Sequence, residues 1–206
     1  HKIASCELTN LPLLKYFAKT GKPLIMSTGF ANVDEVREAV ETIRAEGQND
    51  IILLHCIGAY PPKIEEVNLR FMNKLALEFN CLVGLSDHST EIIVPQAAIA
   101  RGAVCIEKHI TLSKDMEGFD HASSTEPEEL KAMIKGIRTI ESALGTGKRE
   151  IVGVEADLKK LMRKSVLART DLKSGDTITE EMLIIKRPGE GLASREIPNI
   201  VGKVLT

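Results

Sequence analysis

Two histidines, His88 and His109, have the residue type and spacing that point most directly to chemistry. Each follows a short apolar run, in the segments "LVGLSDHS" and "VCIEKHITL". If these runs are neighbouring parallel strands, both imidazoles lie at one edge of a sheet and can share a divalent metal ion. A pair of hydrogen-bonded histidines without a metal is the alternative that the spacing leaves open.

Hydroxyl groups and a positive charge stand at the ends of similar apolar runs. Ser5, Ser27, Thr28 and Ser86, together with Lys2, are donors of the kind that bind a phosphate group. Taken one at a time, each serine is better explained as the cap of a helix or turn. The set as a whole is therefore a candidate phosphate site.

Three carboxylates and one arginine complete the list of reactive side chains. Glu7, Glu107 and Asp120 could hold sugar hydroxyls or transfer protons, or they could form salt bridges at a rim. Arg187, in "RPGEG", could grip a polar ligand through two hydrogen bonds or be solvated.

The composition argues against several classes of protein. The 206 residues carry a formal net charge of −2 and only 3% aromatic side chains, which argues against nucleic-acid binding. No apolar run approaches the roughly 20 residues that span a bilayer, so we expect no membrane partner and a cytoplasmic location. The four cysteines show no CxxC spacing, which favours reduced thiols.

The elements that must position these residues alternate between two kinds. Short Ile-, Leu- and Val-rich runs predict buried parallel strands at 2–5, 23–28, 51–56, 82–86 and 104–110. Helical periodicity follows Asn32, with Glu35 placed for a capping box and Gly47 as a stop, and follows Thr125 as far as Gly145. This order predicts an α/β fold.

Both a barrel and an open sheet fit this order, but no GxGxxG or GxxxxGK[ST] motif supports a nucleotide-binding sheet. Polar residues after every predicted strand favour a (β/α)8 TIM-type barrel, whose sites form at that end. Five strands cannot close a barrel of eight, and the chain opens inside a strand without Met. We therefore expect a fragment that holds about the last five βα units.

The pattern changes near residue 146. We expect residues 1–145 to be the barrel part and 146–165 to be a linker with a bridging helix. Residues 166–206 read as a small, mainly β domain, with turns at "KSGD" and "RPGEG" and a short helical signal at "TEEML".

Several segments together closely resemble the sialic acid synthase family. They are "KIASCELTNLPLL", "GKPLIMSTGFA", "LLHCIGAYPPKIEEVNLR", "VGLSDHS", "IEKHITLSKDMEGFDHASS" and "KRPGEGL". The resemblance implies a barrel followed by a C-terminal antifreeze-like (SAF) domain. It also implies condensation of phosphoenolpyruvate with an N-acetylated hexose, in which the hexose aldehyde is attacked, water adds and phosphate leaves.

The resemblance also implies roles for individual residues. His88 and His109 match residues that bind Mn²⁺ or Mg²⁺, and Lys2, Ser5, Ser27 and Ser86 match residues around phosphoenolpyruvate. Glu7, Tyr60, Glu107 and Asp120 match positions near the sugar, with Glu107, Asp120 and Glu7 nominated for proton handling. Arg187 matches a residue that reaches the partner's barrel in a domain-swapped homodimer. By this match, Glu107 and His109 face the barrel mouth, whereas Lys108 does not.

Some matters stay open at the sequence level. The sugar could be N-acetylmannosamine, its 6-phosphate, or a precursor of legionaminic acid, pseudaminic acid or spore-coat polysaccharide. The chain alone is expected to have little or no activity. A non-catalytic carbohydrate-binding module, or another phosphoenolpyruvate-dependent keto-sugar acid synthase, is the competing interpretation.

Overall fold

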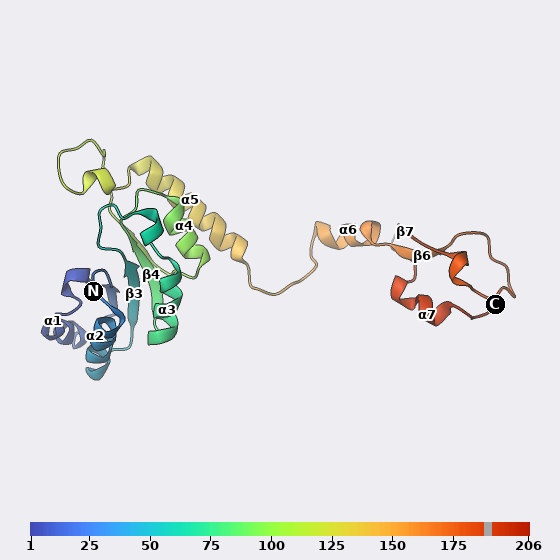
Figure 1. Ribbon diagram of the computed structural model, residues 1–206, viewed down its shortest axis with the longest axis horizontal. Coiled ribbons are helices and arrows are strands. Elements are labelled where there is room, and N and C mark those ends of the chain that lie inside the picture. The colour runs from blue at the N-terminus through green and yellow to red at the C-terminus, as the bar shows by residue number, and fades with distance from the viewer. Residues whose placement is uncertain (188–190) are drawn as a thin grey trace. The chain divides into compact units, whose positions relative to one another are not determined.

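A parallel five-stranded sheet organises the first part of the protein (Figure 1). The computed structural model describes residues 1–187 and 191–206, in two separate units, His1–Thr146 and Gly147–Thr206. In the first unit the strands pair in chain order: β1 (Lys2–Ile3), β2 (Leu24–Ser27), β3 (Ile51–Cys56), β4 (Leu82–Asp87) and β5 (Ile106–Lys108). Parallel neighbours in chain order, each followed by a helix, form part of a βα barrel, as expected.

The helices after the strands cover the outer face of this half-barrel (Figure 1). They are α1 (Leu11–Ala18), α2 (Val33–Ala45), α3 (Arg70–Phe79), α4 (Ile93–Ala100) and α5 (Pro127–Leu144). The predicted capping box of α2 is present, because the Asn32 side chain accepts from the Glu35 N–H at 3.0 Å and Glu35 accepts from the Asn32 N–H at 2.8 Å. The structure confirms both helices predicted from periodicity, which are α2 and α5.

Apolar side chains fill the space between sheet and helices. Leu53 of β3, Ile43 of α2 and Leu75 of α3 are at most 1% exposed, and Met133 of α5 is 4% exposed. Burying such side chains supplies the main driving force for folding. The sheet is therefore a rigid frame for whatever follows its strands.

The strand β5 is shorter than the predicted run 104–110. It pairs only with β4, through the partners Leu85↔Ile106, Ser86↔Glu107 and Asp87↔Lys108. With hydrogen bonds on one side alone, the regular ladder ends at Lys108, and Ile110 forms an isolated bridge to Thr125.

The second unit contains α6 (Val154–Met162), β6 (Ser165–Ala168), β7 (Leu183–Lys186) and α7 (Ile197–Ile200). β6 and β7 pair antiparallel. Gly175, with φ 93°, forms the turn predicted at "KSGD", and the helical signal at "TEEML" is a 3-10 turn over Glu180–Met182. The predicted turn "RPGEG" includes residues 188–190, which lie outside the described ranges. No helix within those ranges has the length and apolarity needed to cross a bilayer.

Candidate functional site

Glu107 is the centre of a polar cluster formed by four strands. Its Oε1 accepts hydrogen bonds from Ser86 Oγ at 2.7 Å and Ser27 Oγ at 3.3 Å. Its Oε2 lies 3.3 Å from Lys2 Nζ. The structure thus brings together four of the residues predicted from strand ends, and the carboxylate holds three donors in one place.

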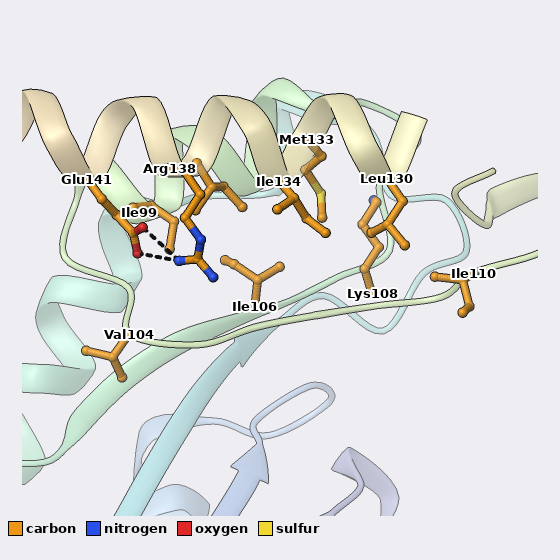
Figure 2. A pocket seen from close by; sticks show the side chains of 11 residues that line it. Ile99, Val104, Ile106, Lys108, Ile110, Leu130, Met133, Ile134, Arg138 and Glu141 are labelled. Atoms are coloured by element: carbon orange, nitrogen blue, oxygen red, sulfur yellow. Dashed lines mark hydrogen bonds and ion pairs between the residues drawn. The ribbon is translucent and has the colours of Figure 1, made fainter. Parts of the chain in front are cut away.

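Alternation along β5 explains why three consecutive polar residues end an apolar strand. Successive side chains of a strand point to opposite faces, so Glu107 faces the sheet interior while Ile106 and Lys108 face the helices. Figure 2 shows Ile106 and Lys108 projecting from β5 toward α5, where they line a cavity of about 330 Å³. Lys108 points away from the polar cluster, as expected.

The two histidines lie next to each other, as predicted. Their ring centroids are 5.3 Å apart, and the Tyr60 ring stacks on His88 at 3.9 Å and meets His109 edge-on at 5.5 Å. Partial burial, followed by the negative charge of nearby groups that include Asp120 and Glu107, raises the pKa of Tyr60. Tyr60 therefore stays a neutral hydrogen-bond donor at neutral pH.

His88 is held by the backbone of the preceding loop. Its Nδ1 lies 2.8 Å from the Ile57 carbonyl oxygen. Because a carbonyl oxygen only accepts, Nδ1 carries the proton, and Nε2 presents its lone pair. This is the arrangement in which a backbone carbonyl orients a metal-binding imidazole.

Asp120 lies beside His109, on the loop that connects β5 and α5. The Asp120 Oδ2 atom is 3.7 Å from His109 Nδ1. Ser124 Oγ and Ser123 Oγ donate to the Asp120 backbone carbonyl at 2.6 and 3.1 Å, which braces this part of the loop. The carboxylate remains exposed to solvent, so it is available to a ligand.

The histidine pair fits a divalent metal ion as part of a coordination shell. Two imidazoles are adjacent, and the tautomer of His88 leaves Nε2 as a ligand. Within residues 1–187 and 191–206, no group of three or more His, Cys, Asp and Glu side chains could hold a metal. An ion here would take its remaining ligands from water or substrate.

The other predicted site residues lie outside these contacts. Ser5 Oγ accepts from the Gly29 N–H at 3.0 Å, which links the loops after β1 and β2. Glu7 accepts from Asn10 Nδ2 at 2.8 Å, at the start of α1. Arg187 is exposed directly after β7 in the second unit. Among the described residues, Glu7 makes no hydrogen bond or ion pair with Glu107, Lys2, Ser27 or Ser86.

Sequence reasoning missed two residues close to the histidines. Cys56 Sγ lies 3.9 Å from His88 Nδ1 and is buried. Asp87 precedes His88 and pairs with Lys108 below the site. The charge of Asp87 at the end of an apolar strand is the one signal that could have identified it, since an isolated buried charge requires a partner.

The comparisons with known proteins concern both units. Residues 1–149 match the model of the NeuB family, and residues 163–206 match the SAF domain. The chain is 43% identical over its whole length to the N,N'-diacetyllegionaminic acid synthase of Legionella pneumophila and 42% identical to that of Campylobacter jejuni. It spans 59% and 62% of those proteins' lengths.

A solved structure resembles the chain in both sequence and fold. The N-acetylneuraminic acid (sialic acid) synthetase of Leptospira borgpetersenii, crystallised with citrate, superposes with a TM-score of 0.70 at 36% identity. The superposition covers 76% of this chain and 55% of the synthetase.

Proposed function

Because the chain belongs to the NeuB family, we propose that the full-length protein condenses phosphoenolpyruvate with an N-acetylated hexose, giving a nonulosonic acid and phosphate. The observation that carries this proposal is the Glu107 cluster of Lys2, Ser27 and Ser86 on the same sheet edge as the His88–His109 pair. An anion-binding set next to two adjacent imidazoles suits a reaction between a phosphorylated acid and an aldehyde.

Lys2, Ser5, Ser27 and Ser86 are proposed to bind phosphoenolpyruvate. They offer one ammonium and three hydroxyl groups, donors that suit the phosphate and carboxylate of this substrate. Glu107 holds Lys2 and two of the hydroxyls in position before the substrate arrives. The side chains are thus oriented in advance, which reduces the entropy lost on binding.

Glu7, Tyr60 and Asp120 are proposed to bind the sugar. A divalent cation, Mn²⁺ or Mg²⁺, held by His88 and His109 would polarise the aldehyde carbonyl. Tyr60, packed against both imidazoles, can donate to a sugar oxygen. Asp120 lies on the His109 side of the site, where it can accept from a sugar hydroxyl.

The proposed reaction exchanges two protons with the protein, and we propose Glu107, Asp120 and Glu7 as the groups that exchange them. The new bond joins C3 of phosphoenolpyruvate to the aldehyde carbon, and the former aldehyde oxygen takes up one proton. Water adds at C2 and gives up one proton. As the C2–O bond to phosphate breaks, the new C2 hydroxyl becomes the ketone and its proton leaves with the phosphate. The protein therefore ends each cycle with its starting proton content.

The acceptor we propose first carries two acetamido groups. The relatives described above at 43% and 42% identity make N,N'-diacetyllegionaminic acid, whose name specifies two acetyl groups. N-acetylmannosamine, its 6-phosphate, and pseudaminic or spore-coat precursors are the other sugars to test.

We further propose that residues 1–145 form the barrel part, residues 146–165 the linker and residues 166–206 the SAF domain. We also propose a domain-swapped homodimer in which Arg187 serves the partner's site. The exposed position of Arg187 supports the latter, because the side chain is accessible to a partner. The four free cysteines support a reducing, cytoplasmic location.

Phosphate release from phosphoenolpyruvate tests the proposal. The full-length protein is assayed with Mn²⁺ and a panel of N-acetylated hexoses, beside His88→Ala and a control, His1→Ala, whose ring contacts Phe17 and Thr20. Release that requires one sugar, persists in the control and disappears in His88→Ala supports the synthase. No release from folded protein with any sugar favours a binding module instead.

A further inference from the structure

A pocket beside the candidate site lies between the loops that follow β2 and β3. Its volume is about 470 Å³, within the range of small-molecule sites. It shares two residues with the surroundings of His88: the Ile57 carbonyl accepts from His88, and Cys56 Sγ lies 3.9 Å from the same ring nitrogen. The pocket therefore borders the mouth that holds the histidine pair.

Phe30, in the wall of this pocket, has an unfavourable backbone and an exposed ring. Its φ is 63°, a left-handed conformation that is unfavourable for a bulky residue. The residue is 75% exposed, so burial within the protein does not compensate for that cost. Such strain is concentrated at functional sites, which makes Phe30 a candidate for contact with a ligand.

A second wall residue, Asn68, shares the left-handed backbone conformation, with φ 47°. Among the described residues, the positive-φ residues other than glycine are Phe30, Asn68 and Asn80. Asn80 ends helix α3, an ordinary place for this conformation. Phe30 and Asn68 both line the pocket between the loops after β2 and β3.

Gly58 explains how the ring of Phe30 reaches its position. A Cβ atom at residue 58 would lie 2.1 to 2.7 Å from three ring carbons of Phe30. Real atoms do not approach so closely, so only glycine at 58 lets the ring rest on the β3 loop. Phe30 and Gly58 thus form one structural unit.

The lining identifies the chemistry of a ligand. Thr28 Oγ1 donates to the Leu54 carbonyl at 3.1 Å, and His55 Nε2 bonds the Val67 carbonyl at 2.7 Å, so both polar groups are engaged within the protein. The rest of the wall is mainly apolar and includes the amide of Asn68; it consists of Phe30, Ala31, Cys56, Ile57, Gly58, Ala59, Asn68 and Phe71. A methyl group next to an amide matches such a surface, and this is the composition of an acetamido group.

We propose that this pocket binds an acetamido substituent of the acceptor sugar, with Phe30 as a specificity-determining residue. The inference rests on the proposed function, because it concerns the acceptor of that reaction. It assigns Phe30, Gly58 and Asn68 a role in distinguishing N-acetylated from unacetylated sugars.

Steady-state kinetics of the full-length protein test this inference. Phe30→Ala and Gly58→Ala are each expected to raise the KM for the N-acetylated acceptor roughly tenfold, the scale on which small apolar groups are discriminated. The KM for phosphoenolpyruvate should not change. The control is Tyr16→Ala, which removes another exposed aromatic ring, on α1. Both variants, unlike the control, should also reduce the preference for the N-acetylated sugar over its free amine.

Two further measurements keep the test decisive. Phe30→Gly relieves the left-handed strain, so the Tm should stay the same or rise while the acceptor KM still increases, which excludes simple misfolding. Calorimetric binding of the N-acetylated hexose, without turnover, should weaken in Phe30→Ala. Unchanged preference and unchanged binding in that variant overturn the pocket assignment. A different result would overturn the proposed reaction: the unmodified protein shows no turnover, although it binds the sugar and Phe30→Ala weakens that binding.

Discussion

Lys108 and Asp87 form an ion pair beneath the candidate site, with Nζ and Oδ2 2.7 Å apart and side chains only 3% and 2% exposed. The two residues are register partners on β5 and β4, and each directly precedes one of the two histidines. Lys108 also donates to the Ser89 carbonyl, and Asp87 Oδ1 accepts from the Ser89 N–H at 2.9 Å. One buried pair thus fastens both strands and the loop after His88.

Lys108→Met is expected to lower the free energy of unfolding by about 3–5 kcal/mol, because it leaves the Asp87 charge buried without a partner. Urea denaturation measures the change. The double variant Lys108→Met with Asp87→Leu should recover much of the loss, since no unpaired charge remains. Lys131→Met is the control, because Lys131 pairs with Glu128 at the surface, where such a pair contributes at most about 1 kcal/mol. Equal losses in both single variants would contradict the importance of burial.

Glu107→Gln should separate the charge of this residue from its hydrogen bonds. The amide oxygen can still accept from Ser27 and Ser86, but the charge next to Lys2 is lost. We expect kcat for phosphate release to fall about 10²–10⁴-fold, the usual contribution of a proton-transferring group. The exposed Glu117→Gln in the following loop is the control. Full kcat in Glu107→Gln would remove this residue from proton transfer.

Metal affinity should depend on both histidines. His88→Ala and His109→Ala each remove one of the two proposed imidazole ligands, so each is expected to weaken Mn²⁺ binding at least about tenfold. Electron paramagnetic resonance of free Mn²⁺ measures this directly, without reference to turnover. His55→Gln, on the helix side of β3, should leave affinity unchanged. If chelation and re-addition of Mn²⁺ leave phosphate release unaffected, the metal has no role in the reaction.

His55 should make stability depend on pH. Burial lowers the pKa of His55 below its usual value of 6.5, although the bond with the Val67 carbonyl opposes the shift. The unfolded chain therefore binds a proton at a higher pH than the folded chain does, and stability falls as pH drops below about 6.5. His55→Gln keeps a donor for Val67 and should flatten this part of a Tm-against-pH curve. A curve that remains equally steep would assign the effect to other groups.

The general location of the site could be predicted from the sequence, but its supporting contacts could not. Apolar runs that end in Ser86, Glu107 and His109 identify strand ends, because charged and polar side chains need an outlet. The pairing of Asp87 with Lys108 depends on the register between two strands, which no local pattern specifies. The placement of Phe30 over Gly58 requires a left-handed Phe, the opposite of what residue preferences indicate. Such conformations become visible only in three dimensions.

The alternation along β5 makes the length of this segment more important than its composition. Lys108 lies among α5 side chains, and its neighbours Glu107 and His109 lie on the opposite face. One residue inserted within the strand, between Ile106 and Glu107, would move the side chains after it to the opposite faces, with an ammonium toward Ser27 and Ser86 and a carboxylate toward Leu130 and Met133. A single-codon insertion here would therefore abolish scaffold and chemistry together, whereas exchanging one aliphatic side chain for another would affect only stability.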